Sequence, residues 1–158
     1  MWVWLKRLLL ALGASLILAQ LVRPSRNNPP IDPNLEIQAS TAVDSAMTAI
    51  LERSCNDCHS SRTVWPWYSQ LAPVSWFLVY DVREGRGDLN LSEWGAYDAQ
   101  RRNKLLTEIC KEVTEGEMPG LPYSVLHPNA KLSAEDVRAI CQWTESARQG
   151  APVRRNEQ

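Results

Sequence analysis

The sequence predicts an all-helical domain with long ordered loops behind one N-terminal transmembrane helix. Two observations support this fold class. An uncharged apolar run lies near the N-terminus, and later segments repeat apolar residues at the spacing of helices, without the alternation typical of strands. A chain of 158 residues is short enough for a single folded domain. The predicted divisions are a membrane anchor or signal peptide at 1–23, an extended linker at 24–40, the folded domain at 41–150 and a tail at 151–158.

The N-terminal run is suited to crossing a bilayer. No residue from 8 to 22 is charged, and the span extends over 2–22 if the long side chains of Lys6 and Arg7 reach the headgroups. At about 1.5 Å per residue, this longer span covers a hydrocarbon core of about 30 Å. A cleaved signal peptide needs small residues at its cleavage site, and Ile17-Leu18-Ala19 fits poorly. We therefore favour an uncleaved anchor, with a signal peptide as the alternative.

Capping residues and helix breakers predict the first elements after the anchor. The stretch "RPSRNNPPIDPN" is rich in Pro and Asn, which is typical of an extended linker. A helix is predicted from Thr41, where "TAVD" has the form of a capping box, and this helix leads directly to Cys55. A second helix is predicted from Pro73 to Gly85, because proline favours helix starts and glycine favours helix ends.

The C-terminal half predicts two more helices around an irregular segment. The first runs from about Asp98 to Glu115 and carries an apolar face. The following "EGEMPGLPYSVLHPNA" is predicted to be irregular because prolines interrupt it. The last helix opens with the capping box "SAED" at Ser133 and ends at Gly150.

The central motif is "CNDCH", in which Cys55 and Cys58 are three residues apart and His59 follows directly. A thioredoxin-like redox pair needs flanking strands, which are not predicted here. A structural zinc site needs four ligands, and the other two cysteines are single, distant residues on helix faces. Covalent attachment of c-type haem does require the adjacent histidine, because two thiols one helical turn apart bond one porphyrin edge while the imidazole binds the iron. We predict a cytochrome c-like helical haem domain with one covalent haem c per chain.

With His59 as the proximal ligand, the iron has one axial position left. Met118 is favoured, because its irregular segment between two helices can reach the opposite face of the ring. His127 is the alternative, and an open or water-bound position is the third possibility. Met47 lies on the helix that leads into the motif, which places it on the wrong side of the ring. Ligation by Met and His raises the reduction potential and closes the iron to substrates, as an electron carrier requires.

Neighbouring aromatic and basic side chains are candidates for contacts with the haem. Four aromatic residues are predicted to wall its site: Trp65, Trp67, Tyr68 and Trp76. Arg83 and Arg86 are candidates for pairing with the propionates, and core packing or a solvated surface position is the alternative for these residues. A backbone carbonyl near Pro73 is a candidate acceptor for the second ring nitrogen of His59, although that proline is equally well explained as a helix start.

Two features lie outside the haem motif. Cys110 and Cys141 both fall on apolar helix faces, and they either form a disulfide between the last two long helices or remain separate buried thiols. The near balance of 17 basic and 18 acidic residues gives no reason to expect a nucleic-acid partner.

The sequence resembles the bacterial haem-binding-domain proteins, which are related in style to c-type cytochromes. The matching stretches between Gln20 and Trp143 are "QLVRP", "NNPP", "CNDCHSSRTVWPWYSQLAPVSW", "DVREGRGDLNLSEW", "GEMP" and "YSVLHPNAKLS". The resemblance implies a single c-type haem domain, usually behind a membrane anchor, with Cys55 and Cys58 as the thioether links and His59 as the proximal ligand. Met118 falls in the Met-Pro motif of this family.

These features together predict a membrane-anchored, single-haem protein that transfers electrons to redox partner proteins in or at the membrane. Haem c is attached outside the cytoplasm, so the domain is expected on the periplasmic side of the bacterial inner membrane. The alternatives are a haem-based sensor or peroxidase-like enzyme with an open sixth position, and a fixed haem subunit of a larger electron-transfer complex. No catalytic constellation is evident, so a carrier is favoured over an enzyme.

Overall fold

The computed structural model describes residues 1–150 and confirms the all-helical fold class, with no strand in that range. The predicted tail at 151–158 lies outside the described residues. The helices in chain order are α1 (Trp2–Ala19), α2 (Ile37–Ser40), α3 (Ser45–Ser54), α4 (Asn56–His59), η1 (Trp67–Gln70), α5 (Val74–Asp88), η2 (Trp94–Ala96), α6 (Ala99–Glu115), α7 (Leu121–Leu126), η3 (Pro128–Ala130) and α8 (Ala134–Arg148), where η marks a short 3₁₀ helix.

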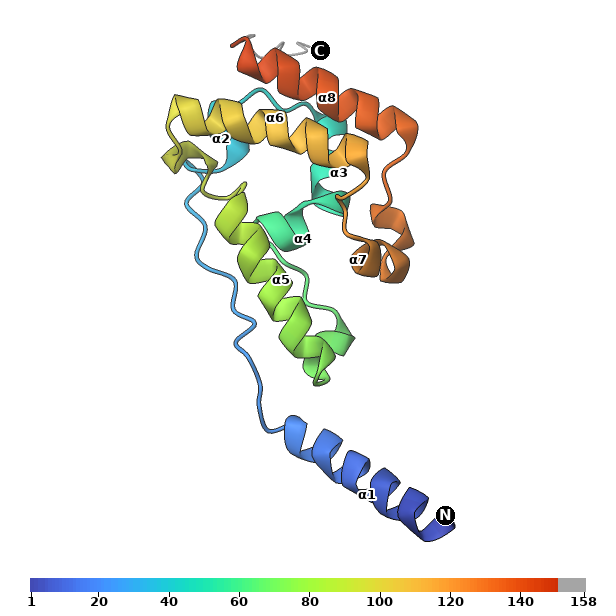
Figure 1. Ribbon diagram of the computed structural model, residues 1–158. Helices are drawn as coiled ribbons and strands as arrows, with labels where there is room; N and C mark the ends of the chain where they lie inside the picture. The colour runs from blue at the N-terminus through green and yellow to red at the C-terminus, as the bar shows by residue number, and fades with distance from the viewer. Residues whose placement is uncertain (151–158) are drawn as a thin grey trace.

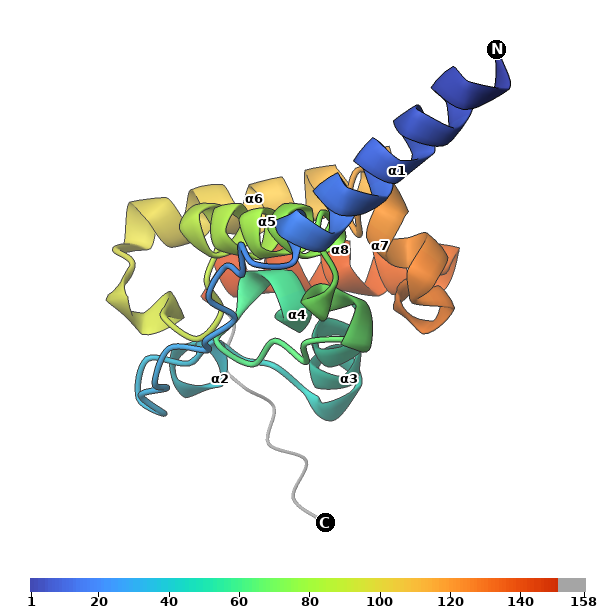
Figure 2. The same cartoon turned by 90° about the horizontal axis from the view of Figure 1, so that it is seen from below.

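Helices α6 and α8 pack side by side at one end of the domain (Figure 1). The C-terminal end of α5 lies beside α4, and its N-terminal end points away from the α6–α8 pair. Helix α1 projects beyond this N-terminal end of α5 (Figures 1 and 2). The core lies between α3, α6 and α8 and includes Met47, Leu51, Leu106 and Ile140. Trp94 is the largest fully buried side chain, and its indole N–H donates to Thr41 Oγ1 at 2.8 Å.

Local capping signals predicted the two C-terminal long helices well. Asp98 caps α6, and Gly116 ends it in the left-handed conformation with φ 76°. Ser133 and Asp136 form the capping box that opens α8, and Gln149 caps its end, one residue before the expected Gly150. These signals involve residues close in sequence, so tertiary packing has little influence on them.

The capping box predicted at Thr41 is wrong. Helix α3 starts at Ser45, and its N-cap is Asp44, whose carboxylate accepts from the Met47 N–H at 2.7 Å. Thr41 instead ends the short helix α2, which the sequence did not predict, and its hydroxyl is used by Trp94. A four-residue helix has too little length for a periodic signal, so it could not be recognised.

Two other boundaries differ from those predicted. Helix α5 continues through Gly85 to Asp88, because this glycine allows a close backbone contact and does not serve as a cap. The segment predicted as irregular contains α7 and η3, each with a proline in its first turn, where the missing N–H is not needed.

A disulfide joins Cys110 on α6 to Cys141 on α8. Of the two possibilities for these residues, the structure supports the disulfide. The bond lies between the two helices that pack most closely together, and it leaves Cys55 and Cys58 as the unpaired cysteines of residues 1–150.

Helix α1 is long and apolar enough to cross a membrane, with a mean hydropathy of 1.6 and no buried residue. A signal sequence meets the same test. The ammonium of Lys6 lies 4.3 Å from the ring centre of Trp2, so it is directed back towards the N-terminal end of the helix. The linker after α1 has no regular structure up to residue 32, as predicted, but it is fastened to the domain by several side-chain hydrogen bonds.

Candidate functional site

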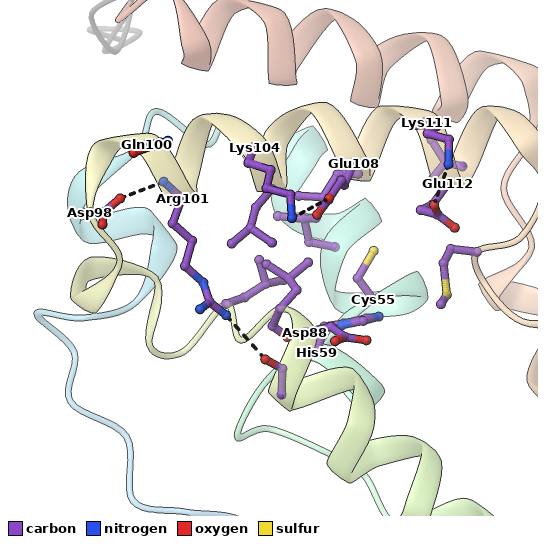
Figure 3. A pocket seen from close by; sticks show the side chains of 18 residues that line it. Cys55, His59, Asp88, Asp98, Gln100, Arg101, Lys104, Glu108, Lys111 and Glu112 are labelled. Carbon is purple, nitrogen blue, oxygen red and sulfur yellow. Dashed lines mark hydrogen bonds and ion pairs between the residues drawn. The ribbon is translucent and has the colours of Figure 1, made fainter.

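The Cys-x-x-Cys-His motif forms a turn of helix between α3 and α5. Helix α3 ends at Ser54, and α4 begins directly after Cys55. The His59 N–H donates to the Cys55 carbonyl at 2.9 Å, so the motif closes a single turn. This turn places Cys55 and His59 beside the end of α5 (Figure 3).

The imidazole of His59 is oriented by the backbone of α5. Its Nδ1 is 2.9 Å from the Gly85 carbonyl and 3.2 Å from the Leu89 carbonyl, so Nδ1 carries the proton and donates. Among residues 1–150, Nε2 has no hydrogen-bond partner, which leaves it available to bind a metal ion. The acceptor expected near Pro73 is therefore incorrect, because the C-terminal end of α5, and not its start, lies against the histidine.

Gly85 makes this arrangement possible. A Cβ at position 85 would lie 2.8 Å from the Cys58 carbonyl oxygen and 3.3 Å from its Cβ, closer than a side chain tolerates. The absence of a side chain lets α5 approach the α4 backbone and present its carbonyl to His59. A Cβ at Gly87, two residues further along α5, would meet nothing within 4 Å.

A cavity of about 1050 Å³ opens beside the motif, between α3, α4, the end of α5 and α6. Cys55, His59 and Met118 all line it, although Met118 is 59 residues from His59 and lies in the segment between α6 and α7. The inner wall is apolar and includes Leu51, Leu89, Leu91, Leu105 and Ile109. The cavity thus combines an apolar interior with a free imidazole, a thiol and a thioether.

Charged side chains form the rim of this cavity on the α6 side (Figure 3). Lys104 pairs with Glu108 at 3.4 Å, and Arg101 donates to the Gly87 carbonyl at 3.5 Å. The guanidinium of Arg101 also lies 4.6 Å from the ring centre of Tyr97. The sequence analysis did not identify these cations, because their position at the rim follows from the docking of α6 and not from a local motif.

Burial keeps both motif thiols protonated. It raises the pKa of Cys55 to about 12, and the neighbouring Cys58 adds to the shift. Burial also raises the pKa of Cys58 to about 11, with further contributions from the charges of Asp57 and Asp81. Cys58 does not line the cavity in this structure, and its environment is the α4–α5 contact.

His127 lies away from the cavity. Its Nε2 is 2.6 Å from the hydroxyl of Tyr68, and its ring stacks on Tyr123 with centres 4.3 Å apart. Tyr123 in turn donates to Asp57 at 2.7 Å, so this histidine belongs to a polar aromatic cluster beneath the α4 turn.

The aromatic residues and the two arginines, Arg83 and Arg86, predicted as haem contacts do not line the cavity either. The indoles of Trp65 and Trp76 donate to the linker, at Asn28 Oδ1 and the Val22 carbonyl respectively, and Trp67 is 74% exposed. Arg86 donates to the linker and to the loop after α4, through Asn28 Oδ1, Thr63 Oγ1 and the Ser60 carbonyl. Trp65, Trp76 and Arg86 thus hold the linker against the domain, a role that sequence spacing alone does not reveal.

The structure also bears on the other interpretations of the motif. Cys110 and Cys141 cannot serve as zinc ligands because they are joined in a disulfide. Among the residues that the structure describes, no group of three or more His, Cys, Asp and Glu side chains is arranged to hold a metal ion. A four-ligand zinc site completed by Cys110 and Cys141 is therefore excluded, and Cys55, Cys58 and His59 are the reactive side chains of the motif.

A model of one protein family, the haem-binding domain, matches residues 14–146. The chain belongs to the haem-binding domain family. The matched range contains the α4 motif, the cavity and Met118. Comparisons with curated proteins and with solved structures found no match.

The site fits the haem that this family implies. Its volume of about 1050 Å³ is just above the roughly 300–1,000 Å³ common for small-molecule and cofactor sites, as a large cofactor requires. The apolar wall suits a large macrocycle. The rim carries Arg101, Lys104 and Lys111, which could pair with acidic groups at the edge of such a ring, beside the carboxylates of Asp88, Asp98, Glu108 and Glu112. His59 offers an unpartnered nitrogen in the fixed orientation that an iron ligand needs.

Proposed function

We propose that this haem-binding domain protein is a membrane-anchored, single-haem c-type protein that transfers electrons. The observation that carries the proposal is the meeting of His59 and Met118 at one cavity. A nitrogen and a thioether from segments far apart in the chain would occupy both axial positions of an iron between them. The haem supplies a one-electron iron couple when bound.

The two free thiols of the motif would provide covalent attachment of the haem. Cys55 and Cys58 would each add S–H across a vinyl double bond, with the sulfur bonding one carbon and the proton moving to the other. Cys58 needs a small rearrangement of the α4 turn to reach the cavity, because it does not line it now.

Residues of α6 and α5 would then hold the ring in place. Leu89, Leu105 and Ile109 would pack against the macrocycle and exclude water, and Arg101 and Lys104 would be available to pair with its acidic groups. The Gly85 carbonyl keeps His59 in the tautomer with a free Nε2. The cavity is open on one side, where a bound haem would be accessible for electron exchange with redox partner proteins at the membrane.

An exported location is consistent with two features. The Cys110–Cys141 disulfide is typical of an oxidising compartment, and α1 has the length of a membrane span. We propose that α1 is an uncleaved anchor in the bacterial inner membrane and that the domain lies on its periplasmic side.

Carbon monoxide binding to the reduced haem-loaded full chain tests the carrier proposal against a sensor or peroxidase-like enzyme. A carrier with both axial positions filled shows no immediate change in its absorption spectrum when the gas is added. The Met118→Ala variant serves as the control, because it opens the sixth position and should bind the gas at once. Immediate binding by the unmodified protein would contradict the carrier proposal and favour a sensor.

A further inference from the structure

Six large side chains of η1, its C-cap and the first turns of α5 are exposed to solvent in the isolated chain. Their exposed fractions run from 38% for Trp76 to 74% for Trp67. Because η1 packs against α5, these side chains form one neighbourhood, which we call the η1–α5 apolar surface. Its members are Trp67, Leu71, Val74, Trp76, Phe77 and Tyr80.

This surface adjoins the end of α1. Gln20 forms two hydrogen bonds with Ala72, one from its amide nitrogen to the carbonyl and one from the Ala72 N–H to its amide oxygen, each 3.0 Å long. The Trp76 indole donates to the Val22 carbonyl at 2.8 Å, and Arg26 donates to the Ser69 carbonyl at 3.0 Å. Figures 1 and 2 both show the start of α5 beside the end of α1.

The length of α1 determines the depth of this contact. Its 18 residues at 1.5 Å each extend over about 27 Å, close to the hydrocarbon thickness of about 30 Å. If α1 spans the bilayer, Gln20 lies at the boundary between hydrocarbon and headgroups. The residues bonded to Gln20 and Val22 are then held at the same level.

The exposed face of α5 changes in polarity along the helix axis. Near α1 it presents Val74, Phe77 and Tyr80, whereas the following turns present Arg83 and Glu84. This order matches the change from acyl chains through headgroups to water. Trp and Tyr are enriched at this boundary, because one part of each ring is apolar and the other forms hydrogen bonds.

We infer that the η1–α5 apolar surface inserts into the headgroup and outer acyl layer of the membrane that α1 spans. The domain would therefore rest on the bilayer in one orientation, with the cavity at the opposite end of α5 directed to the aqueous side (Figure 1). The inference relies on the proposed anchor role of α1. A soluble protein partner is the rival occupant of such a surface, and the hydrogen bonds to the end of α1 favour the lipid.

Photocrosslinking of the full chain in phosphatidylcholine vesicles tests this inference. The photoreactive residue p-benzoylphenylalanine replaces Phe77 or Trp67, and mass spectrometry identifies lipid adducts after irradiation. Position 125 is the matched control, because Val125 is 59% exposed and apolar but lies on α7, away from α1. The haem absorption spectrum of each variant verifies that the fold is retained.

We expect lipid adducts at positions 67 and 77 and none at 125. Absence of lipid adducts at 67 and 77, or equal yields at all three positions, would overturn the inference. A wash of the vesicles at alkaline pH separates this outcome from failure of the anchor. A chain that resists extraction but lacks lipid adducts has an anchor without surface insertion, whereas a chain that is extracted lacks the anchor itself.

Discussion

The imidazole of His59, the proposed iron ligand, is oriented by backbone groups alone. Its Nδ1 contacts two carbonyls of the α5 end, and this contact fixes both the tautomer and the ring plane. No charged side chain takes part in this orientation. It does require a residue without a side chain at position 85, because a Cβ there would collide with the Cys58 backbone. The sequence identifies the histidine through the motif, while its acceptor depends on how two helices dock.

The two motif cysteines give the first prediction. Cys55→Ser or Cys58→Ser should each leave haem attached through one thioether, and the double variant should lose all covalent haem. Serine has the same shape but its hydroxyl does not add across a vinyl group. Haem staining after denaturing electrophoresis and intact-protein mass spectrometry measure the attachment. Retention of covalent haem in the double variant would exclude these residues as the links.

Asp136 gives a prediction about pH. Hydrogen bonding from Arg53, with smaller contributions from Ser133, lowers the pKa of this carboxylate from 3.8 to about 2. A folded-state pKa below the unfolded value means that the stabilisation is complete above about pH 4 and is lost as the pH falls towards 2. Asp136→Asn should lower the free energy of unfolding by about 1–2 kcal/mol at neutral pH, because the ion pair with Arg53 is lost and a neutral amide oxygen accepts more weakly in the capping box.

Urea unfolding of the wild type and the variant measures this difference. The gap between the two proteins should close as the pH approaches the lowered pKa of Asp136. Glu145→Gln is the control, because its pair with Arg148 is on the surface of the same helix and should be worth at most about 0.5 kcal/mol. A gap that stays constant at acidic pH would contradict the assigned role of the Asp136 charge.

At the scale of elements, the contact between α4 and α5 depends on glycine. Gly85→Ala should destabilise the protein by about 1–3 kcal/mol, because the new Cβ must displace the Cys58 backbone. Gly87→Ala is the matched control in the same helix, where open space around the Cβ leaves a helix-propensity gain of up to about 1 kcal/mol. Thermal unfolding at equal haem content measures both, and a stabilised Gly85→Ala would contradict the close contact.

The disulfide provides a second prediction for the elements. It closes a loop across 31 residues between α6 and α8, so its removal should cost about 3–4 kcal/mol by the chain-entropy relation. The double variant Cys110→Ser with Cys141→Ser, compared with the oxidised wild type in denaturant, measures this cost. Reduced wild type should behave like the variant, and identical unfolding of the oxidised and reduced wild type would contradict the bond.

The helix boundaries show which structural features can be predicted from local sequence and which cannot. The capping residues of α6 and α8 are local, so the predicted boundaries agree closely with the structure. The Thr41 signal failed because a distant residue, Trp94, uses the Thr41 hydroxyl. Arg86 and Trp76, which the sequence offers as candidate haem contacts, donate to the linker instead, and these contacts depend on a tertiary fold that no spacing in the sequence reveals.

At the scale of the whole molecule, hydrogen-bonded contacts connect the end of α1 with the cavity. Helix α1 ends beside the start of α5, the linker is fastened along the domain, and the end of α5 supports His59. These contacts would place the proposed haem at a defined height above the bilayer. The motif, the N-terminal apolar helix and the fold class could be predicted from the sequence, whereas this arrangement required the structure.

The most direct test of the central claim, axial ligation by His59 and Met118, is the absorption spectrum of the haem-loaded full chain. We expect sharp low-spin bands and a weak long-wavelength methionine–iron band in the oxidised protein. Met118→Ala should abolish this weak band, and His127→Ala should retain it, because His127 is bonded to Tyr68 away from the cavity. A spectrum that is unchanged by Met118→Ala, or high-spin bands in the unmodified protein, would contradict the claim.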